Sequence, residues 1–154
     1  MIEKKRDKHL LEQQFVVEGG DFIRAGEVSS KIKGILKDIG VSQEVIRRIA
    51  IATYEAEMNV VSYARKGTFY LAITPDRLEI VVKDEGQGIE DIDLAMQEGF
   101  STATEEIREM GFGAGMGLQN IKSCADDMSL TSEVGKGTCL HISFHLNGTK
   151  EREP

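Results

Sequence analysis

A glutamate and an asparagine stand four residues apart in a stretch whose apolar residues recur at helical spacing. Glu55 and Asn59 are therefore expected on one face of a helix, one turn apart. A carboxylate can act as a general base, and an amide oxygen suits Mg²⁺, which keeps several waters when a protein binds it. Taken alone, such a pair is more often simply part of a solvated helix face.

An acidic residue followed by two spaced glycines ends a strand-like run in Asp84-Glu85-Gly86-Gln87-Gly88-Ile89. The Asp84 carboxylate could accept a hydrogen bond from an exocyclic amine, while Gly86 and Gly88 would let the backbone approach a flat ring. Ile89 would then supply an apolar wall. Taken alone, a turn with an acidic start is the preferred interpretation of this segment.

Glycines occupy alternate positions just before a later helical stretch, in Gly111-Phe112-Gly113-Ala114-Gly115-Met116-Gly117-Leu118. Such a run lets successive backbone N–H groups turn toward an anion, and the following helix adds the positive end of its dipole. The alternative is a flexible hinge, but the regular alternation favours phosphate binding. The run is not a Walker A loop, because neither Lys-Ser nor Lys-Thr follows its last glycine.

Composition limits the classes of protein to which these motifs can belong. The chain has 154 residues, 40% hydrophobic and 29% charged, with a formal net charge of −7. These values are typical of a globular protein, and an acidic chain without a basic block is a poor candidate for nucleic-acid binding. Nucleic acid is therefore not an expected partner. A membrane is not expected either, because no apolar run is long enough to span one. Cys124 and Cys139 are expected to be reduced, which predicts a cytoplasmic protein.

Apolar periodicity and turn signals predict the order β-α-α-β-β-loop-α-β-β. The first helix is expected between an N-cap at Asp21 and a stop at Gly40. The second, capped by Ser42, carries the Glu/Asn pair and ends near residues 65–67. Strands are expected at 14–18, 68–74, 77–83, 129–134 and 138–146, with a short helix at 91–97 and a third helix at 116–126.

These elements predict an α+β fold, a two-layer sandwich with helices on one face of the sheet. The sheet is expected to be mixed but mostly antiparallel, because strands adjacent in sequence are joined by tight turns. Residues 13–146 are expected to form one domain between frayed tails at 1–12 and 147–154. The long segment 98–112 is a candidate lid.

The motifs and their order resemble the N, G1, G2 and terminal boxes of the GHKL (Bergerat-fold) ATPases. Those boxes correspond to Glu-x-x-x-Asn on a helix, Asp-x-Gly-x-Gly after a strand, Gly-x-Gly-x-Gly before a helix, and Gly-x-Gly-Thr in a terminal hairpin. The resemblance covers roughly residues 15–146. Size and detail are similar to the bacterial anti-sigma and switch serine/threonine kinases, with 51–59 (IATYEAEMN) similar to their N box.

The resemblance implies a role for each candidate residue in binding and using ATP. Glu55 would be the general base toward the acceptor hydroxyl, and Asn59 would ligate Mg²⁺. Asp84 would receive the adenine amino group, with Thr138 of the terminal hairpin nearby. The remaining residues expected around the adenine are Gly86, Gly88 and Ile89.

By the same resemblance, the glycine run and the lid would enclose the phosphates. Arg108 would reach the terminal phosphate and is the second candidate catalytic residue. The lid departs from the switch kinase by being longer and rich in Glu, so its acidic residues are also candidates for docking a partner. The nucleotide-binding residues expected in the glycine run are Gly111, Gly113, Gly115, Gly117 and Leu118.

The function implied is that of an ATP-dependent serine/threonine protein kinase. Its substrate would be a STAS-domain anti-sigma antagonist or scaffold, in the control of an alternative sigma factor. The alternative is a nucleotide-dependent binding module that sequesters a sigma factor or regulator without phosphoryl transfer. Glu55 favours the kinase, because a pure binder has no use for a base, and a homodimer is compatible with either function.

Overall fold

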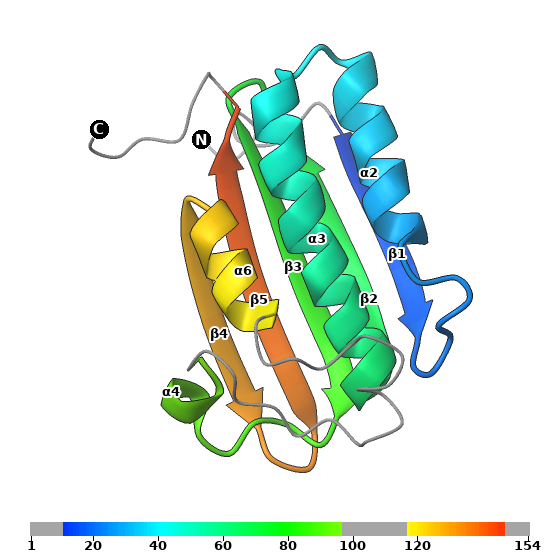
Figure 1. Cartoon of the computed structure of the whole chain (residues 1–154), viewed down its shortest axis with the longest axis vertical. Helices are drawn as coiled ribbons and strands as arrows, with labels where there is room; N and C mark the ends of the chain where they lie inside the picture. The colour runs from blue at the N-terminus through cyan, green and yellow to red at the C-terminus, as the bar shows by residue number, and fades with distance from the viewer. Residues whose placement is uncertain (1–10, 97–116, 147–154) are drawn as a thin grey trace, which may run out of the picture.

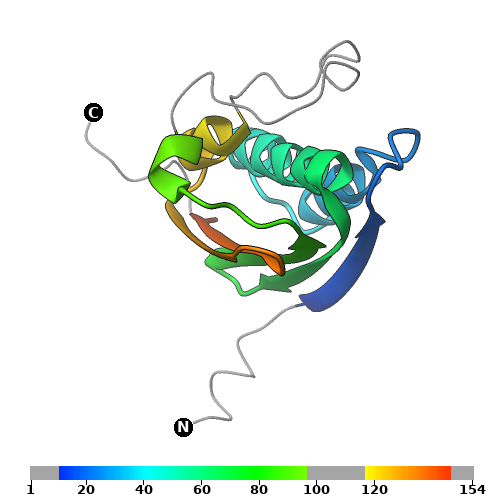
Figure 2. The ribbon, with the colours of Figure 1, turned by 90° about the horizontal axis from the view of Figure 1, so that it is seen from below.

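The computed structural model of the chain describes residues 11–96 and 117–146. Helices cover one face of a five-stranded sheet, which confirms the predicted α+β two-layer fold (Figures 1 and 2). No described helix has both the length and the apolar character needed to cross a membrane. In chain order the elements are β1 (Leu11–Glu18), α2 (Glu27–Asp38), α3 (Gln43–Tyr63), β2 (Ala64–Ile73), β3 (Arg77–Gly86), α4 (Ile92–Ala95), α6 (Gly117–Cys124), β4 (Asp127–Glu133) and β5 (Gly137–His145).

The strands lie in the order β1-β2-β3-β5-β4, and every pairing between them is antiparallel, so the prediction of a mixed sheet was wrong. Alternate side chains of each strand point toward the helices, so that Phe69, Ile80 and Phe144 are fully buried between the two layers. The predicted hairpin at Pro75-Asp76 is confirmed, with Thr74 N–H donating to the Arg77 carbonyl over 2.8 Å.

The long helix α3 lies across the middle of the sheet (Figure 1). Ser42 caps it as predicted, accepting a hydrogen bond from Val45 N–H at 3.4 Å. The predicted core stripe is buried and consists of Val45, Ile49, Ala52, Ala56 and Val60. The helix ends at Tyr63, before the predicted 65–67, because the chain from Ala64 onward pairs with neighbouring strands as β2.

Two predicted boundaries near the N-terminus were wrong. Strand β1 begins at Leu11, so it includes residues that were assigned to a frayed tail. Helix α2 begins at Glu27 and not just after Asp21, whose carboxyl instead accepts from Arg24 N–H within a turn at 3.3 Å. The N-cap of α2 is Gly26, which has a left-handed φ of 101° and provides no side chain to cap the helix.

The carboxyl group of Glu57, on α3, takes the place of that missing cap. Its Oε2 accepts from the backbone N–H groups of Gly26 at 3.0 Å and Val28 at 3.1 Å, and its Oε1 accepts from Ser29 N–H at 3.1 Å. These are donors that a helix cannot satisfy internally. Glu57 is only 1% exposed, so this contact fixes the start of α2 against the middle of α3.

We predict that Glu57→Ala lowers the free energy of unfolding by about 3 kcal/mol, because it leaves buried N–H groups without an acceptor. Urea denaturation followed by circular dichroism measures the loss. Lys33→Ala, on the exposed side of α2, is the control and should change stability by less than about 0.5 kcal/mol. A Glu57→Ala variant as stable as that control would contradict the capping role.

Candidate functional site

The face of the sheet that packs on the helices becomes polar at one end. Asp84 continues the inward alternation of Leu78, Ile80 and Val82 along β3. Thr138 does the same at the start of β5, and Ser132 lies opposite it on β4. This end of the sheet, where α3 ends and α6 begins, is the lower end in Figure 1.

Hydrogen bonds join these polar residues into one network. Asp84 Oδ1 accepts from Thr138 N–H at 3.1 Å, and the hydroxyls of Thr138 and Ser132 lie 3.1 Å apart. The Ser132 hydroxyl also accepts from Ile89 N–H at 2.7 Å. The segment after β3 is therefore joined to the β4–β5 hairpin through the hydrogen bond from Ile89 to Ser132.

Burial raises the pKa of the Asp84 carboxyl above its ordinary value, and the hydrogen bond from Thr138 N–H, which lowers it, offsets only part of that effect. Asp84 Oδ2 has no hydrogen-bond partner among the residues that the structure describes. The site therefore contains a partly buried carboxyl group with one acceptor oxygen that no described residue uses.

Close approaches of the backbone explain the glycines at this end of the sheet. A Cβ on Gly137 would lie 2.0 Å from the Asp84 carbonyl oxygen, and one on Gly88 would lie 2.5 Å from the Glu133 carbonyl oxygen. At Gly86 a Cβ would lie 3.2 Å from the Tyr63 carbonyl oxygen. The strand ends can thus pack this tightly only without side chains at these positions.

Glu55 and Asn59 lie on the side of α3 that faces the start of α6. A Cβ on Gly117, the first residue of α6, would lie 3.2 Å from Asn59 Oδ1 and 3.4 Å from Glu55 Oε1. Asn120 Nδ2 donates to Glu55 Oε2 at 3.1 Å. The predicted Glu/Asn pair and the last glycine of the glycine run are therefore brought together.

Helix α6 is held against α3 at its other end as well. The Arg48 guanidinium of α3 donates to the carbonyl of Cys124, the last residue of α6, at 2.8 Å, and lies 3.9 Å from the Asp126 carboxyl group. Ile121, between the two contacts, is fully buried. The side chains that α6 presents to Glu55 are thus carried by a helix anchored along its length.

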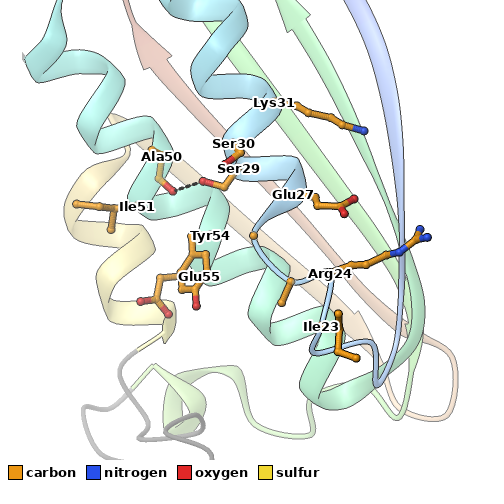
Figure 3. Close-up of a pocket in the computed structure, with 12 residues that line it drawn as sticks. Ile23, Arg24, Glu27, Ser29, Ser30, Lys31, Ala50, Ile51, Tyr54 and Glu55 are labelled. Carbon is orange, nitrogen blue, oxygen red and sulfur yellow. Dashed lines mark hydrogen bonds between the residues drawn. The ribbon is translucent and has the colours of Figure 1, made fainter.

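A groove of about 750 Å³ lies between α2 and α3, and Glu55 forms part of its lining. Figure 3 shows the Glu55 side chain pointing toward the start of α6, with Ile51 and Tyr54 beside it on α3. Across the groove, Ile23 and Arg24 come from the loop before α2. Ile23 is 97% exposed, and Ile51 and Tyr54 are also exposed, so apolar side chains line both sides of the groove.

The remaining predicted site residues divide into two groups. Leu118 is partly buried against the core at the start of α6. The others, Arg108, Gly111, Gly113 and Gly115, lie outside the described residues.

Two residues of the site, Asn120 and Ser132, were not predicted from the sequence. Asn120 follows Gly117 by three residues, so helical spacing alone places both on one face of the third predicted helix. Ser132 pairs with Thr138 across the predicted Gly135-Lys136-Gly137 turn, so the hairpin register would have placed it in the site. Helical spacing does not, however, show that Asn120 lies opposite Glu55 on α3.

The oxygen donors near Glu55 suit a metal ion that takes only some of its ligands from the protein. Within the described ranges, no three His, Cys, Asp or Glu side chains are grouped as metal ligands. The Asn59 amide oxygen and the Glu55 carboxyl group are hard oxygen donors. Mg²⁺ needs only a few oxygen donors from a protein when phosphates and water complete its coordination.

Residues 22–144 match the model of the histidine kinase-like ATPase domain, and the chain belongs to that family. It is 34% identical over 110 residues to the serine/threonine-protein kinase RsbT of Bacillus subtilis. The aligned residues cover 69% of this chain and 77% of RsbT. It is 33% identical over 107 residues to an anti-sigma F factor of Thermoanaerobacter sp. (strain X514). That match covers 70% of this chain and 67% of the anti-sigma factor.

Two solved structures show the same fold at low sequence identity. The SiaB–SiaC complex of Pseudomonas aeruginosa matches with a TM-score of 0.61 at 13% identity, covering 93% of this chain and 94% of that one. The RsbU and RsbW domains of a Mycobacterium tuberculosis protein match with a TM-score of 0.57 at 15% identity, covering 87% of this chain and 32% of that one.

We predict that Asp84→Asn stabilises the ligand-free protein at neutral pH. The pKa of Asp84 is higher in the folded protein than in the unfolded chain, so at a pH above the folded-state pKa the ionised carboxyl group destabilises the fold. This penalty disappears as the pH falls from the folded-state pKa to the unfolded-state pKa of Asp84. The gain should be at most about 1 kcal/mol, since the group is only partly buried.

Urea denaturation of both proteins from pH 7 to pH 3 measures the difference in unfolding free energy. The difference should shrink toward zero at the acid end, where Asp84 is protonated in both states. An advantage for Asp84→Asn that stays constant over this range would contradict burial as its cause.

Proposed function

We propose that this chain is an ATP-dependent serine/threonine protein kinase that phosphorylates a STAS-domain regulator in the control of an alternative sigma factor. The observation that carries the proposal is the placement of Glu55, which lies between the start of α6 and an open groove. Family membership supports ATP as the phosphoryl donor. A kinase that acts in the control of a sigma factor would be located in the cytoplasm.

We assign the adenine to the polar end of the sheet. Asp84 Oδ2 would accept a hydrogen bond from the exocyclic amine, while Thr138 N–H holds the other oxygen of the same carboxyl group. Ile89 would provide an apolar contact beside the ring. The backbone at Gly86 and Gly88 would complete the pocket without side chains to fill it.

The phosphates would lie at the start of α6, where the helix dipole and the N–H groups of its first turn favour negative charge. Gly117 and Leu118 would contribute there. Four residues outside the described ranges are assigned to the same phosphates by family resemblance, namely Arg108, Gly111, Gly113 and Gly115.

Asn59 is proposed as the protein ligand of Mg²⁺, through its amide oxygen beside Gly117. Bound Mg²⁺ would neutralise negative charge on the phosphates. Because Asn59 is neutral, it adds an oxygen donor without adding a negative charge that would repel the phosphates.

Glu55 is proposed as the general base. It accepts the proton of the Ser or Thr hydroxyl while that oxygen forms its bond to the γ-phosphorus of ATP and the bond from that phosphorus to the β-phosphate oxygen breaks. The products are a phosphorylated side chain and ADP, with the proton on Glu55. Much of the rate would come from holding these groups in position.

The groove beside Glu55 is the proposed approach for the acceptor protein. Its apolar side chains Ile23, Ile51 and Tyr54 are all exposed, and such a patch is typical of a protein-binding surface. A Ser or Thr on a segment bound there could reach Glu55 without crossing either helix. The name of the RsbT kinase supports a protein as the substrate.

A nucleotide-dependent anti-sigma module is the second candidate function. Several relatives are named anti-sigma F factor, which favours the sequestering of a sigma factor. The same nucleotide pocket would serve either function. Only the fate of the γ-phosphoryl group separates them.

We predict that Glu55→Gln reduces phosphorylation of a STAS-domain partner by about 10²- to 10⁴-fold, because Gln keeps the shape of Glu but cannot take the proton. Radiolabelled ATP with purified candidate partners measures the transfer, and calorimetry measures ATP affinity, which should change by less than about threefold, or 0.7 kcal/mol.

The matched control is Glu44→Gln, on the exposed first turn of the same helix, which should transfer phosphate at the wild-type rate. Equal labelling by Glu55→Gln and the control would remove Glu55 from the chemistry. A stable wild-type complex with a sigma factor, formed with ATP but never labelling any partner, would instead establish the binding module.

We predict that Asn59→Ala weakens binding of ATP about tenfold in the presence of Mg²⁺, a loss of about 1.4 kcal/mol, and leaves binding in EDTA unchanged. Calorimetry under both conditions makes the comparison, with Arg47→Ala, on the exposed side of α3, as the control. Equal losses with and without the metal would mean that Asn59 contacts the nucleotide and not the ion.

A further inference from the structure

One hydrogen bond fixes the orientation of the candidate base. Asn120 Nδ2, on α6, donates to Oε2 of Glu55, on α3, at 3.1 Å. We propose that Asn120 is a positioning residue, whose amide holds the Glu55 carboxyl group so that Oε1 is turned toward the acceptor hydroxyl. This inference rests on the proposed role of Glu55 as the base.

The need for such a contact follows from the glutamate side chain. Three torsions separate the Glu55 carboxyl group from the backbone, and the residue lies at the edge of an open groove. Without a partner, the carboxyl group would sample several rotamers. A general base must instead lie within hydrogen-bond reach of one particular proton, so a fixed rotamer directly improves the step.

The chemical nature of Asn120 suits this task better than a charged donor would. A Lys or Arg would hold the carboxyl group but would also stabilise its negative charge and weaken it as a base. An Asp or Glu would repel it. The amide of Asn is neutral, does not titrate and donates an N–H, so it orients Glu55 and leaves it able to accept a proton.

The backbone that carries Asn120 is itself fixed relative to α3. Ile121, the next residue, is fully buried, and the end of α6 is held by the hydrogen bond from Arg48 to the Cys124 carbonyl. Such anchoring is what a residue needs in order to hold another within a fraction of an ångström.

The first residue of α6 keeps the second oxygen of Glu55 accessible. A Cβ at Gly117 would lie 3.2 Å from Asn59 Oδ1, which is tight, and would come into contact with Glu55 Oε1 at 3.4 Å, so a side chain there would occupy the space beside both groups. One turn of α6 therefore provides a donor to Oε2 through Asn120 and leaves space beside Oε1 through Gly117. Together they give the two carboxyl oxygens of Glu55 different roles.

The kinetic test compares Asn120→Ala, Asn120→Asp and the control Lys122→Ala, an exposed position on the same helix. Phosphotransfer to a STAS-domain partner is measured with saturating ATP. Asn120→Ala should lower kcat about 10²-fold, as expected for a displaced catalytic group, with KM for ATP changed less than about twofold.

Asn120→Asp separates positioning from packing. Asp has nearly the shape of Asn, so a role in helix packing alone would make it milder than Ala. A positioning role makes it at least as harmful as Ala, because Asp cannot donate the N–H and repels the carboxylate. In a Glu55→Gln background, Asn120→Ala should cause little further loss, since its effect acts through Glu55. Independent, multiplicative losses would overturn the proposal.

A crystallographic measurement keeps the inference separate from the proposed function. Crystal structures of the wild type and of Asn120→Ala should show one Glu55 conformer in the former and several in the latter. If Glu55 keeps the same single conformer in the variant, the proposal is overturned whatever the kinetics. If Glu55 loses its orientation but the wild type phosphorylates no partner, the positioning contact stands and the kinase function fails.

Discussion

The arrangement of the helices depends on the buried carboxyl group of Glu57. It satisfies three backbone donors at the start of α2 where Gly26 offers no side chain, and thereby joins α2 to the middle of α3. The groove between these helices is lined by Gly26 and Ser29, two of the residues whose backbone N–H groups donate to Glu57. Glu55, two residues earlier on α3, points away toward α6. One turn of α3 thus carries an acidic side chain that joins it to α2 and another that contacts α6.

Helix α3 serves as the common support for every layer around the candidate site. One side buries Ile49, Ala52 and Ala56 against the sheet, a second receives α2, and a third, with Arg48 and Glu55, receives α6. Helix α3 cannot move without disturbing all three of these interfaces, so its side chains keep their positions relative to the sheet, α2 and α6. A groove, a carboxyl group and a helix start are therefore held in one fixed geometry, as a transfer reaction between two bound molecules requires.

Local signals in the sequence were sufficient for the order of the elements, the Ser42 cap, the hairpin at Pro75-Asp76 and the shared face of Glu55 and Asn59, because each depends on residues close together in the chain. The start of α2 was predicted incorrectly for the opposite reason. Asp21 is a good local cap, but the donors of α2 are satisfied by Glu57, 31 residues from Gly26. Asn120 escaped prediction likewise, since its partner lies 65 residues away.

The environment of Asp84 is difficult to explain by stability alone. Its carboxyl group is buried enough to raise its pKa, yet it satisfies one oxygen with a backbone N–H and leaves the other without a partner among the described residues. The tight packing of Gly137 against the Asp84 carbonyl does not depend on the side chain, whose one described hydrogen bond is the one from Thr138 N–H. Retaining a destabilising carboxyl group at the polar end of the sheet makes physical sense if a ligand donates a hydrogen bond to it.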